Sequence, residues 1–126
     1  MALVRAVALR DFRATANALS TTANGAAIGT FSPVSGEKLY GALHVMATST
    51  QRAFLMTIQS ATSSGFTTPT TRISFTDPVG ARSGEWATPV AGLSTDIKYW
   101  RASWTLSTVG LTTGGTWTGF VWMGIQ

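Results

Sequence analysis

Side chains able to do acid–base, nucleophilic or metal chemistry are few in this chain of 126 residues. It contains one histidine, His44, five acidic residues and no cysteine. A histidine base needs a nucleophile and an orienting acid within reach, and no spacing around His44 indicates either. We therefore expect a structural histidine and a protein that is not an enzyme.

Metal and cofactor sites lack ligands in the same way. Without cysteine there are no thiolate sites, and a single histidine excludes two-histidine motifs. The acids are well separated along the chain: Asp11, Glu37, Asp77, Glu85 and Asp96. A paired-carboxylate glycosidase site stays open only because sequence separation does not fix spatial separation. The glycine-rich segment 110–116 precedes an expected strand, which indicates a hairpin loop and not a phosphate site. We expect no metal and no cofactor.

The charge pattern disfavours nucleic acid and membrane partners. The formal charge is +4, but only 11% of residues are charged, and beyond Arg13 the basic residues are scattered singly. The apolar start of the chain is interrupted by Arg5 and Arg10, so neither a signal peptide nor a spanning segment is expected. We expect synthesis in a cytoplasm and use in soluble or assembled form.

The elements that carry these residues are predicted to be strands. The chain has 21 Thr, 12 Ser and 13 Gly, a composition that favours strands and turns. Alternating patterns predict strands at 27–31, 38–47, 53–60, 71–76, 85–88, 97–107 and 116–125. Their spacing indicates an all-β fold, an antiparallel two-sheet sandwich of jelly-roll type, because two packed sheets bury both inner faces.

Residues 1–24 differ from the rest, being rich in alanine and arginine and free of glycine and proline. We interpret them as an extended N-terminal arm or edge strand, with a short helix as the competing interpretation. Asn24-Gly25 then marks a turn, so the sandwich domain is expected to cover residues 25–126. The arm is predicted to anchor to a neighbouring subunit through Leu3, Val4, Arg5, Val7, Leu9, Arg10, Phe12 and Arg13.

Tryptophans gather toward the C-terminal end of the sequence. Trp100 and Trp104 share one face of the segment 97–107, and both faces of the segment 116–125 are apolar. The simplest explanation is a tryptophan-rich core. A second is an aromatic interface between subunits, with Trp100, Trp104 and Trp122 as its candidates, because tryptophan is a common interface anchor. A third is stacking of sugar on an exposed tryptophan.

The low charge also predicts association, since soluble monomers usually carry more surface charge. We expect a homo-oligomer, with a trimer favoured.

The strand patterns resemble those of small tailed-bacteriophage virion structural proteins of the capsid cement or decoration type. The similarity covers roughly residues 25–126 and excludes the arm. Its segments are Leu39-Tyr40, Leu43-His44-Val45, Ile58-Gln59-Ser60, Thr71-Arg72-Ile73-Ser74-Phe75, Tyr99-Trp100-Arg101, Trp104-Thr105 and Phe120 to Ile125.

The resemblance implies a mechanical function on the outer surface of the virion head. Such a protein binds the major capsid protein and stabilises the shell, after synthesis in the host cytoplasm. Its arm would pair with a neighbour by strand addition. The alternative is a phage tail or fibre sandwich module that binds host-surface glycan.

Overall fold

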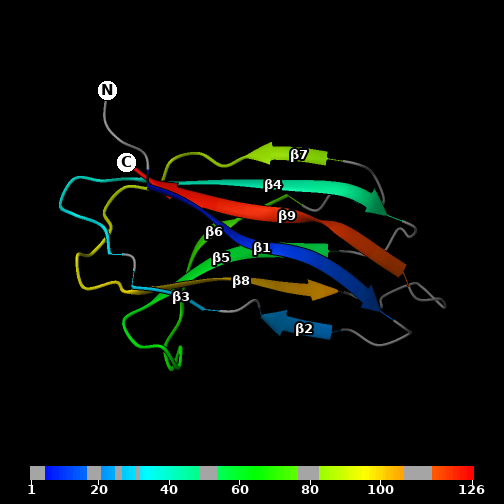
Figure 1. Cartoon of the computed structure of the whole chain (residues 1–126), viewed down its shortest axis with the longest axis horizontal. Coiled ribbons are helices and arrows are strands. Elements are labelled where there is room, and N and C mark those ends of the chain that lie inside the picture. The colour runs from blue at the N-terminus through cyan, green and yellow to red at the C-terminus, as the bar shows by residue number, and fades with distance from the viewer. Residues whose placement is uncertain are drawn as a thin grey trace.

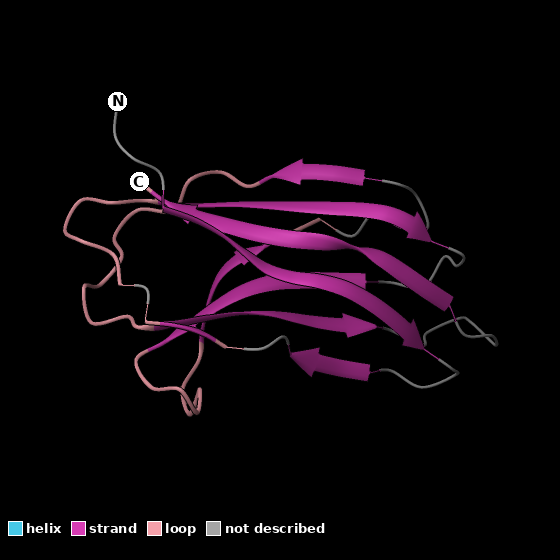
Figure 2. Ribbon diagram, in the orientation of Figure 1, coloured by secondary structure: helices cyan, strands magenta, loops and turns pink. Residues whose placement is uncertain are grey.

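Strands follow the alternating segments of the sequence closely in the computed structural model (Figure 1). The structure describes residues 5–16, 21–24, 27–30, 32–48, 54–76, 83–106 and 115–126. Their strands are β1 (Arg5–Ala16), β2 (Thr21–Asn24), β3 (Ile28–Gly29), β4 (Leu39–Thr48), β5 (Phe54–Ala61), β6 (Thr70–Ser74), β7 (Ser83–Trp86), β8 (Tyr99–Leu106) and β9 (Gly115–Ile125). These residues include no helix long and apolar enough to cross a membrane (Figure 2).

Two antiparallel sheets make up the fold. Sheet A has the strand order β1-β9-β4-β7, and sheet B has the order β2-β8-β5-β6, with the short β3 also paired to β8. Figure 1 shows β7 at one rim of the molecule and β2 at the opposite rim. The predicted all-β, two-sheet sandwich is confirmed.

The strand order is that of a jelly roll, and it can be understood as one long hairpin wrapped around itself. The innermost pair is β5 with β6, followed outward by β4 with β7, β2 with β8, and β1 with β9. Wrapping adds the contacts β9–β4 and β8–β5, which join the two halves of each sheet. Jelly rolls limit exposed sheet edges in this way.

The segment predicted as an arm or edge strand is an edge strand of sheet A. From Arg5 to Ala16 its backbone pairs with β9, with one register shift between Ala8 and Arg10. Part of the remaining segment, β2, pairs with β8 in sheet B. The arm interpretation is therefore wrong for residues 5–16 and 21–24, because each segment pairs along one side with a strand of the same chain.

The core lies between the two sheets and takes its residues from alternate strand positions. Sheet A contributes Leu39, Leu43, Val45, Val121, Met123 and Ile125, and sheet B contributes Met56, Ile58, Ile73, Trp100, Ala102 and Trp104. Leu39, Leu43 and Val45, which the alternation puts on one face of the strand, are all buried. Gly41 is needed between them, because a Cβ there would lie 2.8 Å from Ile73 Cδ1 and 2.9 Å from Ile58 Cδ1.

Candidate functional site

Trp100 and Trp104, two of the three candidate interface tryptophans, are core residues. Trp100 is 0% exposed and Trp104 is 6% exposed in the isolated chain. They project from β8 toward sheet A and pack in the same cluster as Met56 and Val121. The interface prediction is wrong for this pair, because surface anchors must be accessible before the partner binds.

Trp122, the third candidate, lies on the outer face of sheet A. Val121, Met123 and Ile125 of β9 are buried inward, so Phe120 and Trp122 point outward and are half-buried. Neighbouring strands add aromatic rings to the same surface. We call this surface the aromatic face and define it as Tyr40, His44, Trp86, Phe120 and Trp122.

Strand register creates a close tryptophan pair on the aromatic face. Ala42 on β4 is the partner of Trp86 on β7 and of Trp122 on β9. The two outer strands are separated by β4, a span of roughly 10 Å, yet the ring centroids are only 4.8 Å apart, at 85°. The tryptophans therefore lean toward each other over β4, which explains why Ala42 is 0% exposed. Edge-to-face contact of this kind is a favoured aromatic geometry.

His44 belongs to the same surface and has a packing role there. Its ring stacks on Phe120, its register partner, with centroids 4.8 Å apart and planes inclined by 11°. On the other side its register partner is Gly84, which brings no side chain. Among the described residues no group of three histidines or acids could hold a metal ion.

The acidic residues are held by local backbone and hydroxyl groups where the structure describes them. Glu85 accepts hydrogen bonds from the Thr76 backbone N–H at 2.7 Å and from the Thr76 hydroxyl at 3.0 Å. Glu37 accepts one from the Val34 N–H at 2.6 Å, and Asp96 accepts one from the Ser94 hydroxyl. Asp77 lies outside the described residues, and only the backbone of Asp11 is described.

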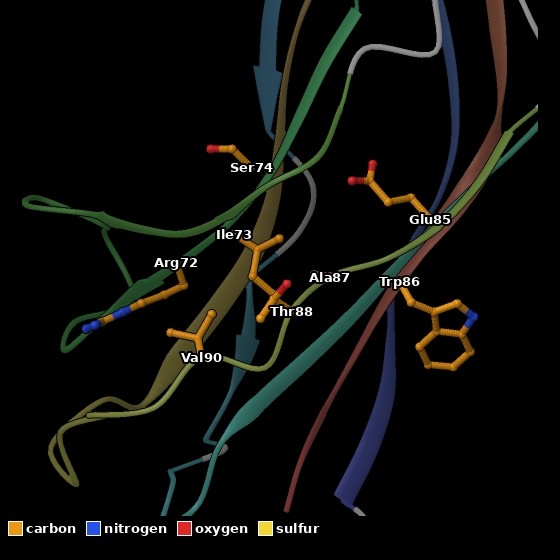
Figure 3. Close-up of a pocket in the computed structure, with 8 residues that line it drawn as sticks. All are labelled: Arg72, Ile73, Ser74, Glu85, Trp86, Ala87, Thr88 and Val90. Carbon is orange, nitrogen blue, oxygen red and sulfur yellow. The ribbon is translucent and has the colours of Figure 1, made fainter.

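A pocket of about 290 Å³ opens where the edge strands of the two sheets meet (Figure 3). Strand β6 closes sheet B on this side, and β7 with its following loop closes sheet A. The lining residues are Arg72, Ile73, Ser74, Glu85, Trp86, Ala87, Thr88 and Val90. No sequence pattern indicates this site, since it depends on two sheet edges that meet only after both sheets form.

The outer face of sheet B is polar, in contrast to that of sheet A. Arg101 Nε donates to Gln59 Oε1 at 2.9 Å, and its Cζ lies 4.2 Å from the Phe66 ring centroid. The Thr57 hydroxyl donates to the Ser103 carbonyl at 3.2 Å. We call Thr57, Gln59, Arg101, Ser103 and Thr105 the polar face. Leu55 beside them is the one large exposed apolar side chain among the described residues of β5 and β8.

The predicted arm contacts fall largely beyond what the structure describes. Leu3 and Val4 lie outside the described residues. The others are described by their backbone alone, as members of β1: Arg5, Val7, Leu9, Arg10, Phe12 and Arg13. Their role at an interface stays a prediction.

Comparison with known proteins places the fold beside viral structures. No protein-family model and no curated protein matches this chain. A chain in the structure of infectious bursal disease virus Gt strain matches with a TM-score of 0.63 and 12% identity, over 98% of this chain and 32% of that chain. A chain of the Gx strain matches with a TM-score of 0.61 and 13% identity, over 98% and 31%. This chain thus spans about a third of the length of those chains, and at these identities the likeness shows a shared fold.

Proposed function

We propose that this protein is a structural component of a virus particle, and more specifically a bacteriophage capsid cement or decoration protein that binds the major capsid protein and stabilises the head. The observation that carries the proposal is the aromatic face, an apolar surface on the outside of a finished sandwich. Exposed apolar patches of this kind mark interaction sites. The shared fold with chains of a virus structure supports the same class.

The aromatic face has the composition of an interface centre. Tryptophan, tyrosine and phenylalanine are enriched where protein surfaces meet, and a few such residues carry most of the binding free energy. Trp122 and Phe120 lie on β9, an inner strand of sheet A, while Trp86 lies on the edge strand β7. Burial of this centre against a capsid subunit, repeated over many copies, would raise the force needed to rupture the shell.

Strand β1 offers a second contact. It ends sheet A, with β9 as its only strand partner among the described strands. An edge of this length can add a strand from another chain through main-chain hydrogen bonds. The proposal therefore retains the predicted arm residues, now as part of an edge strand. A neighbouring capsid subunit, or another copy of this protein in a homotrimer, would extend the sheet at this edge.

Co-sedimentation of the purified protein with DNA-filled and emptied phage heads tests this function. We expect hundreds of copies to bind each particle, in a fixed ratio to the capsid subunits. The reason is that the symmetric shell repeats the same contact many times. Trp122→Ala should weaken binding by roughly 2–4 kcal/mol, as for an interface hot spot. The matched control is Leu55→Ala on the outer side of sheet B, which should bind as the parent does. Equal binding by both variants, with their folds intact, would refute the aromatic face as the contact.

The second candidate function is a tail or fibre module that binds host-surface glycan. The specific observation in its favour is Trp86, which is 67% exposed although it is the largest type of apolar side chain. The same sedimentation experiment separates the two, since a tail module would bind only tailed particles, in a handful of copies.

A further inference from the structure

The pocket between β6 and β7 has an amphipathic lining. Ile73 is buried, and Ala87 and Val90 are half-buried, so they form an apolar floor. The exposed hydroxyl of Thr88 lies at its side, whereas Ser74, the register partner of Thr57, points to the outer face of sheet B (Figure 3). Its volume of about 290 Å³ is at the lower end of small-molecule sites, and it equals the liquid volume of roughly ten waters. A single small ring with polar groups at its rim and apolar faces fits such a space.

Two charged side chains flank the pocket, and each is already held in position. Arg72 Nε donates to Ser60 Oγ at 2.8 Å, and Ser60 is itself buried. Glu85 is fixed by its two hydrogen bonds from Thr76. One cation and one anion among the lining residues give no net charge, which favours a neutral ligand over a phosphate or a cation.

Trp86 extends the site beyond the pocket. Figure 3 shows its ring on the other side of β7 from Ile73, Thr88 and Val90. Consecutive residues of a strand point to opposite faces, so Glu85 faces the pocket side while Trp86 faces the aromatic face. A ligand that uses both the pocket and the ring must therefore cross the edge of β7, and needs at least two linked units.

From these features we infer that the β6–β7 edge binds a neutral oligosaccharide, with one sugar ring in the pocket and a neighbouring ring against Trp86. Sugar rings carry hydroxyl groups at their rim and C–H groups on their faces. The hydroxyls match Thr88 and the charged side chains of Arg72 and Glu85, and the C–H face matches the negative π-face of an indole. This site rests on the second candidate function, glycan binding, whose ligand and position it specifies, and it does not depend on the capsid role.

Titration calorimetry on the full chain tests the inference with defined neutral probes. These are cellotetraose, maltotetraose and tetra-N-acetylchitotetraose, each compared with its own monosaccharide. We expect at least one tetrasaccharide to bind more tightly than its monosaccharide, because only the longer ligand reaches both sides of β7. Failure of all three at millimolar concentration would overturn the site, and equal affinity of monosaccharide and tetrasaccharide would overturn the two-sided arrangement.

Variants then locate the binding. Thr88→Val keeps the shape and removes a pocket hydroxyl, so affinity should fall roughly threefold to tenfold. Thr68→Val is the matched control, an equally exposed threonine in the loop 62–69 outside the pocket. Trp86→Ala should lose about fivefold or more, and Trp86→Phe should regain part of it. Unchanged affinity in both Thr88→Val and Trp86→Ala would overturn the assignment, whatever the outcome of the particle-binding experiment.

Discussion

The two outer faces of this sandwich are built by the same alternation but carry opposite chemistry. On sheet A, rings from three neighbouring strands meet: Trp86 contacts Trp122 across β4, and His44 stacks on Phe120. On sheet B, the corresponding positions hold hydroxyl and amide groups, and the Arg101 guanidinium covers Phe66. Because one face of an antiparallel sheet can stay solvated, the polar face needs no cover. The aromatic face is far richer in apolar rings, and this difference is the reason that we propose sheet A as the contact surface.

The strongest test of this difference compares Trp100 in the core with Trp86 on the aromatic face, and the core residue is expected to give the larger effect. Trp100→Ala should lower the free energy of unfolding by about 3–5 kcal/mol, because it empties a fully buried site between the sheets. Urea denaturation followed by circular dichroism measures the change. A loss below about 1 kcal/mol would mean that Trp100 does not hold the two sheets together.

A smaller effect is expected on the inner side of sheet A, beneath the aromatic face. Gly41→Ala should cost about 1–3 kcal/mol, since the new Cβ meets Ile58 and Ile73 in the packed core. The matched control is Gly84→Ala on β7, where the nearest atom, His44 Cε1, would be 3.7 Å away. That variant should be neutral or stabilising, because alanine restricts the unfolded chain. Equal losses in the two variants would contradict the close packing at Gly41.

On the aromatic face itself, Trp86→Ala should cost about 0.5–1.5 kcal/mol, the value of an aromatic pair. The loss of the indole uncovers Ala42 and leaves Trp122 without its edge-to-face partner. Thermal unfolding of the variant, followed by circular dichroism, measures the loss of stability. A destabilisation as large as that of Trp100→Ala would show that the face is part of the core.

Substitutions on the polar face should change the free energy of unfolding least. Arg101→Met removes the contact with Phe66 and the hydrogen bond to Gln59 but keeps the aliphatic stem, so we expect about 0.5–1 kcal/mol. Chemical denaturation at low and high salt measures it. A loss above about 2 kcal/mol would indicate that the polar face also contributes strongly to stability, and would weaken the contrast between the two sheets.

Alternation along each strand was enough to predict most of the fold. The expected strand at 38–47 is Leu39–Thr48, and that at 116–125 is Gly115–Ile125. The patterns also identified which residues share a face. They did not indicate which face of the segment 116–125 turns inward, since both of its faces are apolar. They also left Trp100 and Trp104 open between core and interface, and the structure places both in the core.

The candidate site was harder to predict because its parts come from distant strands. Trp86 and Trp122 are brought together by their common partner Ala42, and the pocket joins Glu85 to Arg72 across the gap between sheets. No spacing in the sequence encodes these pairings, which arise only from the wrapped strand order. The edge position of β1 was foreseen as one alternative, but its pairing with β9 likewise depends on tertiary structure.

That pairing has a consequence for how the chain reaches its fold. In sheet A, β9 lies between β1 and β4, so the first long strand stays without its neighbour until the last described strand has been synthesised. Contacts between segments so far apart slow the search for the native state, and folds of this kind reach it in milliseconds to seconds. During translation sheet A therefore remains incomplete, while the nearby β5–β6 hairpin can form early. Chaperone dependence in the producing cell would follow from this order of events.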